Sequence, residues 1–307
     1  MTDSASHTAT TTTDSAARPS FGITDFLLFM MAVIWGVNFV VVKYATQVFN
    51  PVAFTGLRVG TAALFLVLVA VARGRFSLPR RDVIGLLMAG VIGNGLYQLF
   101  FVHGVARTRA GNAALIVAAA PAFIALFARL RGLERVKRMT LIGIALSVLG
   151  VGLVIAGSAR PSNGQATTLL GSVLVFLGVL CWSVYTIMLQ PYTKRIDVFR
   201  LSAITMVGGA VPLLLASTPA LIDTDWGAVG QSGWWALFYS SVISMGVAYF
   251  FWYRGLRVLG PTRTAVYANL QPIIALAVAW AFLGEIPTIF QGVGAATIVA
   301  GVFLTRS

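Results

Sequence analysis

Long apolar segments, each close to twenty residues, recur along the chain from Asp25 to its C-terminal end. An α-helix of that length spans about 30 Å, the thickness of the hydrocarbon core of a bilayer. Short polar breaks separate the segments. The pattern predicts ten transmembrane helices, over residues 25–47, 51–72, 83–106, 110–130, 138–157, 169–190, 197–217, 233–257, 262–283 and 286–305.

Composition favours a membrane protein over a large soluble core. Of the 307 residues, 58% are hydrophobic and only 10% are charged, whereas soluble chains carry about 25% charged residues. The mean hydropathy is +0.88. A transmembrane β-barrel would alternate apolar and polar residues, which these segments do not. The expected fold class is an all-α integral membrane protein.

The net charge of +13 comes from short basic clusters between the apolar segments. Under the ten-helix topology, one side of the membrane receives only Lys43, Arg107, Arg109 and Arg160, and Arg58 lies inside a span. The remaining Lys and Arg residues fall on the side of the termini. The positive-inside rule therefore predicts cytoplasmic termini and a multi-pass protein of the inner (plasma) membrane. This distribution explains the charge better than nucleic-acid binding does.

The second half of the chain repeats the first. A shift of 151 residues superposes Pro121 on Pro272 and Glu134 on Glu285, and a shift of 147 pairs Trp35 with Trp182. A duplicated unit of five crossings must enter the membrane in the opposite orientation, which gives an inverted 5+5 repeat. The expected divisions are a disordered cytoplasmic tail at 1–24 and two five-helix repeats at 25–158 and 169–306.

Several local stretches are distinctive in combination. They are Trp35-Gly36-Val37-Asn38-Phe39, Leu57-Arg58, Ala113-Ala114-Leu115-Ile116 with Pro121, Leu133-Glu134-Arg135, Gly260-Pro261-Thr262, Gln271-Pro272 and Leu283-Gly284-Glu285. With these stretches the chain resembles the drug/metabolite transporter superfamily, in particular its EamA-type ten-helix members, from about Phe26 to Thr305. Within that family it looks most like the YddG-type exporters of aromatic amino acids. The resemblance implies a transporter and not an enzyme.

Polar and aromatic residues fall on one face of the third predicted helix and on the equivalent face of the eighth. In an inverted repeat such faces meet near the bilayer midplane, where substrates bind. The alternatives are interfacial aromatic belts and hydrogen bonds between helices. The candidate substrate-binding residues are Tyr97, Gln98, Phe101, Tyr249, Trp252 and Tyr253, joined by Trp35, Asn38, Trp182 and Tyr185 from helices one and six.

Lys43 and Arg58 are candidates for attracting a substrate carboxylate, although snorkelling to the headgroups is the commoner behaviour of such side chains. His103 is a conceivable proton relay or a packed residue. For Glu285 and its partner in the repeat, a role at a helix end is favoured over ion coupling. Pro121 and Pro272 are expected to kink helices four and nine and are hinge candidates, unless the kinks are static.

The favoured function is export of small amphipathic metabolites, most of all aromatic and neutral amino acids, by alternating access. Without a mid-span carboxylate, facilitated diffusion is expected. Other metabolites or drugs are alternative substrates. A membrane-embedded enzyme or a channel is disfavoured, because no nucleophile with a base, no HExxH motif and no cofactor or metal site is visible. The expected partners are a small-molecule substrate and the lipid bilayer, with the protein a monomer or weak homodimer.

Overall fold

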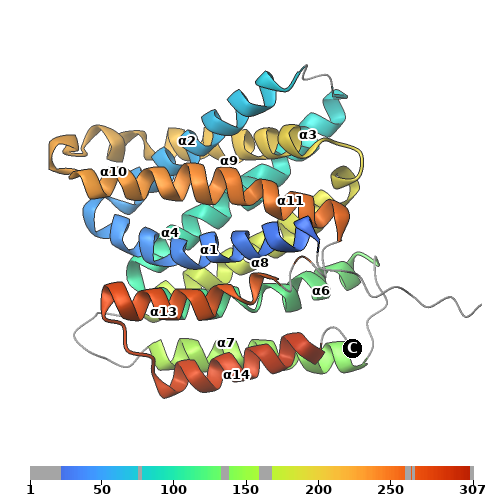
Figure 1. The fold of residues 1–307 in the computed structure, drawn as a ribbon, viewed down its shortest axis with the longest axis vertical. Coiled ribbons are helices and arrows are strands. Elements are labelled where there is room, and N and C mark those ends of the chain that lie inside the picture. Colours follow the sequence, from blue (N-terminus) through green and yellow to red (C-terminus); the bar gives the residue numbers. More distant parts are fainter. Residues whose placement is uncertain are drawn as a thin grey trace, which may run out of the picture.

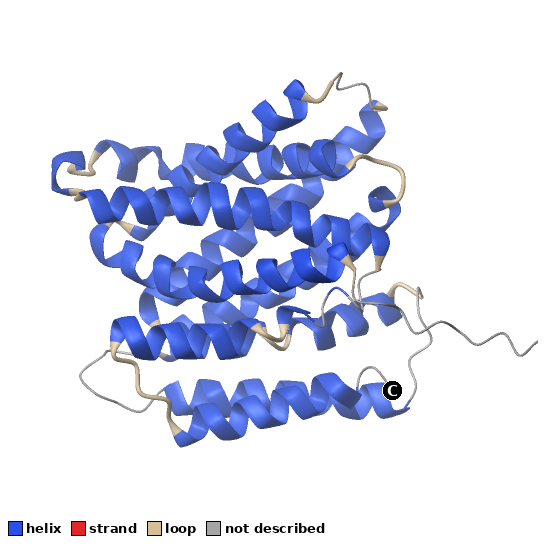
Figure 2. Cartoon of the chain, in the orientation of Figure 1, coloured by secondary structure: helices blue, strands red, loops and turns tan. Residues whose placement is uncertain are grey.

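The computed structural model describes residues 22–74, 78–132, 138–158, 168–259, 264 and 267–304. Throughout these ranges the regular structure is helical, and no strand occurs in them (Figure 2). Nearly all of the predicted N-terminal tail and the repeat residue Glu134 lie outside the described residues. The predicted boundaries of the tail and of the two repeats remain predictions.

The helices of the first half, in chain order, are α1 (Ile23–Val48), α2 (Pro51–Ala72), α3 (Arg80–Gly90), the π-helix η1 (Val91–Leu96), α4 (Tyr97–Arg107), α5 (Ala110–Val117), α6 (Ala120–Leu130) and α7 (Arg138–Ser158). Those of the second half are α8 (Leu169–Thr193), α9 (Val198–Ile222), the 3₁₀ turn η2 (Trp226–Ala228), α10 (Gln231–Phe238), the π-helix η3 (Tyr239–Val247), α11 (Ala248–Val258), α13 (Gln271–Leu283) and α14 (Ile289–Leu304).

Local sequence accounts for where several helices begin and end. The side chain of Asn50 accepts a hydrogen bond from the amide of Val52 and is followed by Pro51, a residue suited to a first helical turn. Asp197 caps α9 in the same way. Gly284 follows α13 with a φ of 65°, a left-handed conformation that costs glycine little. These caps satisfy backbone groups that have no partner within their own helix.

Seven helices of the described part are long and apolar enough to cross a membrane, and three shorter apolar helices accompany them. Their positions coincide with the ten predicted spans, although in the ninth predicted range the apolar helix runs only from Gln271 to Leu283. The prediction of an all-helical, multi-pass membrane fold is confirmed.

Packing follows the internal repeat (Figure 1). α7 pairs with α14 at one end of the molecule, and α2 pairs with α9 at the other. Between these pairs, α1 packs against α11 and α13, and its repeat equivalent α8 packs against α4 and α6. These helix pairs therefore map onto one another when the two halves are exchanged.

Two kinds of irregularity occur at equivalent places in both halves. The π-helices η1 and η3 interrupt the third and eighth spans, and such segments are frequent at functional sites. The fourth span is divided at Ala118–Ala119, and Pro121 lies in the first turn of α6. Pro272 likewise lies in the first turn of α13. The expected kinks take the form of breaks in the two spans, because each proline lies in the first turn of the segment that follows the break, where its missing N–H costs little. The hinge role of the two prolines stays a prediction.

Candidate functional site

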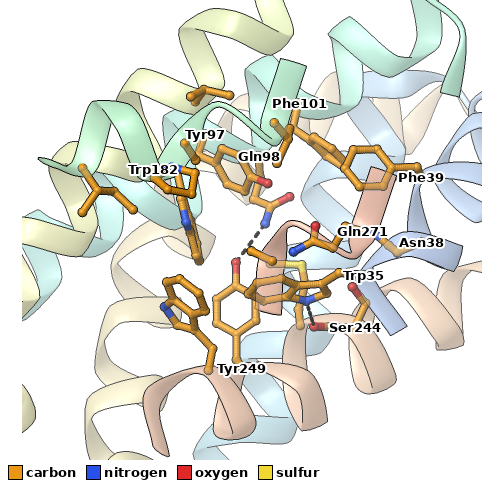
Figure 3. Close-up of a pocket in the computed structure, with 18 of the residues that line it drawn as sticks. Trp35, Asn38, Phe39, Tyr97, Gln98, Phe101, Trp182, Ser244, Tyr249 and Gln271 are labelled. Carbon is orange, nitrogen blue, oxygen red and sulfur yellow. Dashed lines mark hydrogen bonds between the residues drawn. The ribbon is translucent and has the colours of Figure 1, made fainter. Parts of the chain in front are cut away.

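A cavity of about 50 Å³ lies in the middle of the bundle, where elements of both halves of the chain meet (Figure 3). Its walls are formed by side chains of α1, α2, α4, α5, α6, α8, η3, α11 and α13, and by Ala268, which precedes α13. The residues that line it are Trp35, Asn38, Phe39, Arg58, Tyr97, Gln98, Phe101, Val117, Ala120, Pro121, Ile124, Val179, Trp182, Ser244, Met245, Tyr249, Trp252, Ala268 and Gln271.

Aromatic rings from both halves pack on one another at this cavity. Trp35 and Trp182, equivalent by the shift of 147, meet edge to face with their ring centroids 5.8 Å apart. Tyr249 contacts the same two rings at 5.7 and 5.8 Å, also edge to face. Trp252 lies 5.6 Å from each of them. Edge-to-face pairs each stabilise the packing by about 0.5–1.5 kcal/mol beyond the area they bury.

A hydrogen-bonded chain of polar groups crosses the aromatic cluster. Arg58 donates from Nη1 to Oε1 of Gln98, 2.8 Å away. Gln98 in turn donates from Nε2 to the hydroxyl of Tyr249 at 3.2 Å, the contact drawn in Figure 3. Gln98 and Tyr249 are related by the repeat shift of 151, so equivalent residues of the two halves meet here.

The π-helix η3 presents backbone carbonyl groups to this cluster. The carbonyl oxygen of Ser240 accepts from Nε of Arg58 at 3.1 Å. That of Ser244 accepts from the indole N–H of Trp35 at 3.0 Å (Figure 3). Because a π-helix departs from the regular i to i+4 bonding pattern, its carbonyl groups are available to side chains of neighbouring helices.

Most candidate substrate-binding residues line the cavity, and two do not. Tyr185 and Tyr253 hydrogen-bond to each other through their hydroxyl groups, and Asn94 donates to Tyr185. Both tyrosines are buried against the rings of the cluster, Tyr185 against Trp182 and Tyr253 against Tyr249. The two tyrosines were expected in the cavity wall, and they instead pack behind it.

The sequence interpretation missed several lining residues. Gln271 and Phe39 belong to stretches that carry the family resemblance, yet neither was selected as a site residue. A polar residue next to Pro272 within an apolar span was the available indication for Gln271. For the apolar residues beside the α5–α6 break, such as Val117 and Ala120, the sequence contained no indication of a place in the cavity wall.

The two candidate basic residues have different surroundings. Arg58 is buried and lines the cavity, so the snorkelling interpretation is wrong for it. Lys43 does not line it and donates to the carbonyl groups of Val105, Ala106 and Thr108 at 2.8–3.2 Å. A cation there satisfies the free carbonyls at the C-terminus of α4.

Glu285 acts at a helix end, as expected, and the helix end belongs to the other half of the chain. Its carboxylate accepts from the amides of Ala110 and Gly111 at 3.0 and 3.1 Å, at the N-terminus of α5. Arg109 lies 3.9 Å from it. His103, the proton-relay candidate, contacts Arg107 through Nδ1 at 3.1 Å and does not line the cavity.

These features define a helical, multi-pass membrane protein with a polar and aromatic site between its halves. The sequence pattern of the EamA-like transporter family matches residues 22–156 and again residues 169–307. The chain belongs to this family and is a membrane transporter of the drug/metabolite type.

Individual relatives are similar over most of their length. The "Uncharacterized transporter YyaM" of Bacillus subtilis is 27% identical over 284 residues, which are 92% of each chain. A Salmonella typhimurium protein named "Probable amino-acid metabolite efflux pump" is 28% identical over 291 residues, 91% of this chain and 93% of its own. A solved structure with 19% identity covers 91% of this chain and 94% of its own with a TM-score of 0.63, which supports the fold.

Proposed function

We propose that the protein exports small amphipathic metabolites, above all aromatic and neutral amino acids, as YddG-type exporters do. The observation that carries this proposal is the ring-lined cavity with Arg58 and Gln98 in its wall. Aromatic rings suit an apolar side chain, and a few polar groups orient the remainder of a small ligand. Similarity to a protein named as an amino-acid metabolite efflux pump agrees with both the substrate class and the direction.

Transport proceeds by alternating access in this proposal. The cavity of about 50 Å³ has room for a few water molecules, whereas pockets that hold small ligands measure about 300–1,000 Å³. Substrate entry therefore requires the rings and the helices that carry them to separate. The helix breaks beside Pro121 and Pro272 are the places where the two halves would hinge.

The protein works as a monomer or weak homodimer in the inner membrane, with both termini in the cytoplasm. It moves substrate down the substrate's own gradient. The basic clusters on one side of the topology support this orientation.

The test is uptake by proteoliposomes containing the purified protein, across all amino acids and several amphipathic drugs. We expect saturable uptake of aromatic and neutral amino acids, and Tyr97→Ala, Gln98→Ala and Trp252→Ala should each reduce it at least about tenfold. Trp235→Ala is the matched control, because Trp235 lies on α10 with 62% of its surface exposed and away from the cavity. Transport of drugs or other metabolites without amino acids would contradict the proposal.

A further inference from the structure

Arg58 is a buried cation inside a membrane span. It is the eighth residue of α2, about 10 Å along the helix axis from Pro51, and 2% of its surface is exposed. A charged side chain within the bilayer is costly even on insertion scales. Its presence there calls for an interaction that uses the charge.

The described residues supply only neutral partners to Arg58. Ser240 and Gln98 accept one hydrogen bond each, and the ring of Phe101 lies 5.8 Å from the guanidinium carbon. A guanidinium has five N–H donors, and no carboxylate of the described residues forms an ion pair with it. The group is thus held in place with donors to spare, beside a cavity that it lines.

Two further polar atoms at the same cavity lack partners. Oδ1 of Asn38 and Nε1 of Trp252 are buried, and neither has a hydrogen-bond partner among the described residues. Both residues line the cavity, and 5% and 1% of their surfaces are exposed. Leaving a buried polar atom without a hydrogen-bond partner is destabilising. A ligand with a carboxylate and an ammonium group would complement the arginine and the amide oxygen.

We propose that Arg58 binds the carboxylate of the transported molecule and that Oδ1 of Asn38 accepts a hydrogen bond from its ammonium group. The inference rests on the proposed function insofar as the ligand is an amino acid. The apolar part of the ligand then lies among the rings of Trp35, Trp182 and Tyr249. The site thereby distinguishes carboxylates from the corresponding amides and amines.

A purely structural role for Arg58 predicts a different specificity. If the side chain only joins α2 to Gln98 of α4 and to η3, its replacement disturbs the cavity for every ligand alike. If it binds the carboxylate, replacement affects only ligands that carry one. The ratio of the affinity for a carboxylate ligand to the affinity for its amide distinguishes these two roles, whereas the absolute affinity for either ligand does not.

The experiment measures binding of phenylalanine, phenylalaninamide, 3-phenylpropionate and phenethylamine to the purified full-length protein by calorimetry. The wild type should bind phenylalanine at least about tenfold more tightly than phenylalaninamide. In Arg58→Gln this ratio should fall close to one, and Arg58→Lys should retain part of it. Lys43→Gln, which removes a charge outside the cavity, should leave the ratio unchanged. In Asn38→Leu, the preference for phenylalanine over 3-phenylpropionate should disappear.

Equal binding of phenylalanine and its amide by the wild type would overturn the inference, as would a ratio that survives in Arg58→Gln. If Arg58→Gln does not fold, Arg58→Lys and the wild-type panel decide. Adding 3-phenylpropionamide, the amide of 3-phenylpropionate, allows the carboxylate preference to be measured on ligands without an ammonium group. This comparison tests the Arg58 assignment separately from the proposed function. A carboxylate preference without amino-acid transport would remove the proposed function and keep the Arg58 assignment. Amino-acid transport without that preference would do the reverse.

Discussion

At the scale of single residues, Trp35 and Trp252 occupy the same aromatic cluster and differ in the hydrogen bonding of their indole N–H groups. The indole N–H of Trp35 is bonded to the carbonyl of Ser244, and that of Trp252 has no partner among the described residues. A phenylalanine at either position keeps a ring and removes the N–H. The two substitutions therefore compare a satisfied donor with an unsatisfied one.

We expect Trp35→Phe to reduce the free energy of unfolding by about 1 kcal/mol more than Trp252→Phe does. Loss of Trp35 Nε1 breaks a hydrogen bond, and loss of Trp252 Nε1 removes a buried donor that nothing satisfies. The measurement is thermal unfolding of both variants in one detergent. Equal destabilisation, or the reverse order, would show that Trp252 Nε1 is bonded in solution.

The sequence predicted which residues share a helix face, but it did not predict which other residues they contact. The spacing of Tyr97, Gln98 and Phe101 placed them on one face of a helix, and all three line the cavity. The same reasoning did not separate Tyr249, which lines the cavity, from Tyr253, which packs behind it. Those two differ by one helical turn, and only the tilt and rotation of α11 within the bundle decides between them.

At the scale of elements, glycines set the distance between α7 and α14. A Cβ on Gly150 would lie 2.8 Å from the carbonyl oxygen of Gly294, and a Cβ on Gly301 would lie 2.5 Å from that of Gly143. These two contacts are related by the repeat shift of 151. The absence of side chains at these positions therefore permits close contact between the two helices.

We expect Gly301→Ala to lower the melting temperature and Gly292→Ala to leave it unchanged or raise it. Both glycines lie in α14, but a Cβ on Gly292 meets nothing within 4 Å. The first substitution forces the helices apart, at a cost of about 1–3 kcal/mol, and the second improves helix propensity by up to about 1 kcal/mol. Gly150→Ala and Gly152→Ala form the corresponding pair in α7. Matching melting temperatures within a pair would mean that the two helices are further apart than described.

At the scale of the whole molecule, the buried acid Glu285 bears on energy coupling. Many pumps link proton binding at an intramembrane carboxylate to substrate binding. Glu285 is buried, but its oxygens accept from the N-terminus of α5 and it lies close to Arg109. It joins the two halves at one end of the bundle and lies outside the cavity wall. No other acidic residue of the described part lies in the cavity wall either.

We therefore expect zwitterionic substrates to equilibrate across the membrane without accumulating against a gradient. A ligand shifts the inward/outward equilibrium only through differential affinity, and no ion site is evident among the described residues to add a second bias. Proteoliposomes loaded with substrate would be given a pH difference or a potassium diffusion potential. Steady accumulation above equilibrium under either gradient would show coupling, and its loss in Glu285→Gln or His103→Ala would identify the residue responsible.

The sequence by itself determined the helical membrane class, the positions of the spans and the residues that correspond between the halves. These properties depend on how favourably each apolar segment transfers into hydrocarbon and on a repeat that is visible in the amino-acid sequence. Only the tertiary structure decided that the equivalent residues Gln98 and Tyr249 meet, and that Tyr185 packs behind the cavity wall. It also decided that Arg58 faces a cavity while Lys43 closes the end of a helix. Those outcomes depend on how each helix is rotated and where it crosses its neighbours, and side-chain packing between segments far apart in sequence sets both.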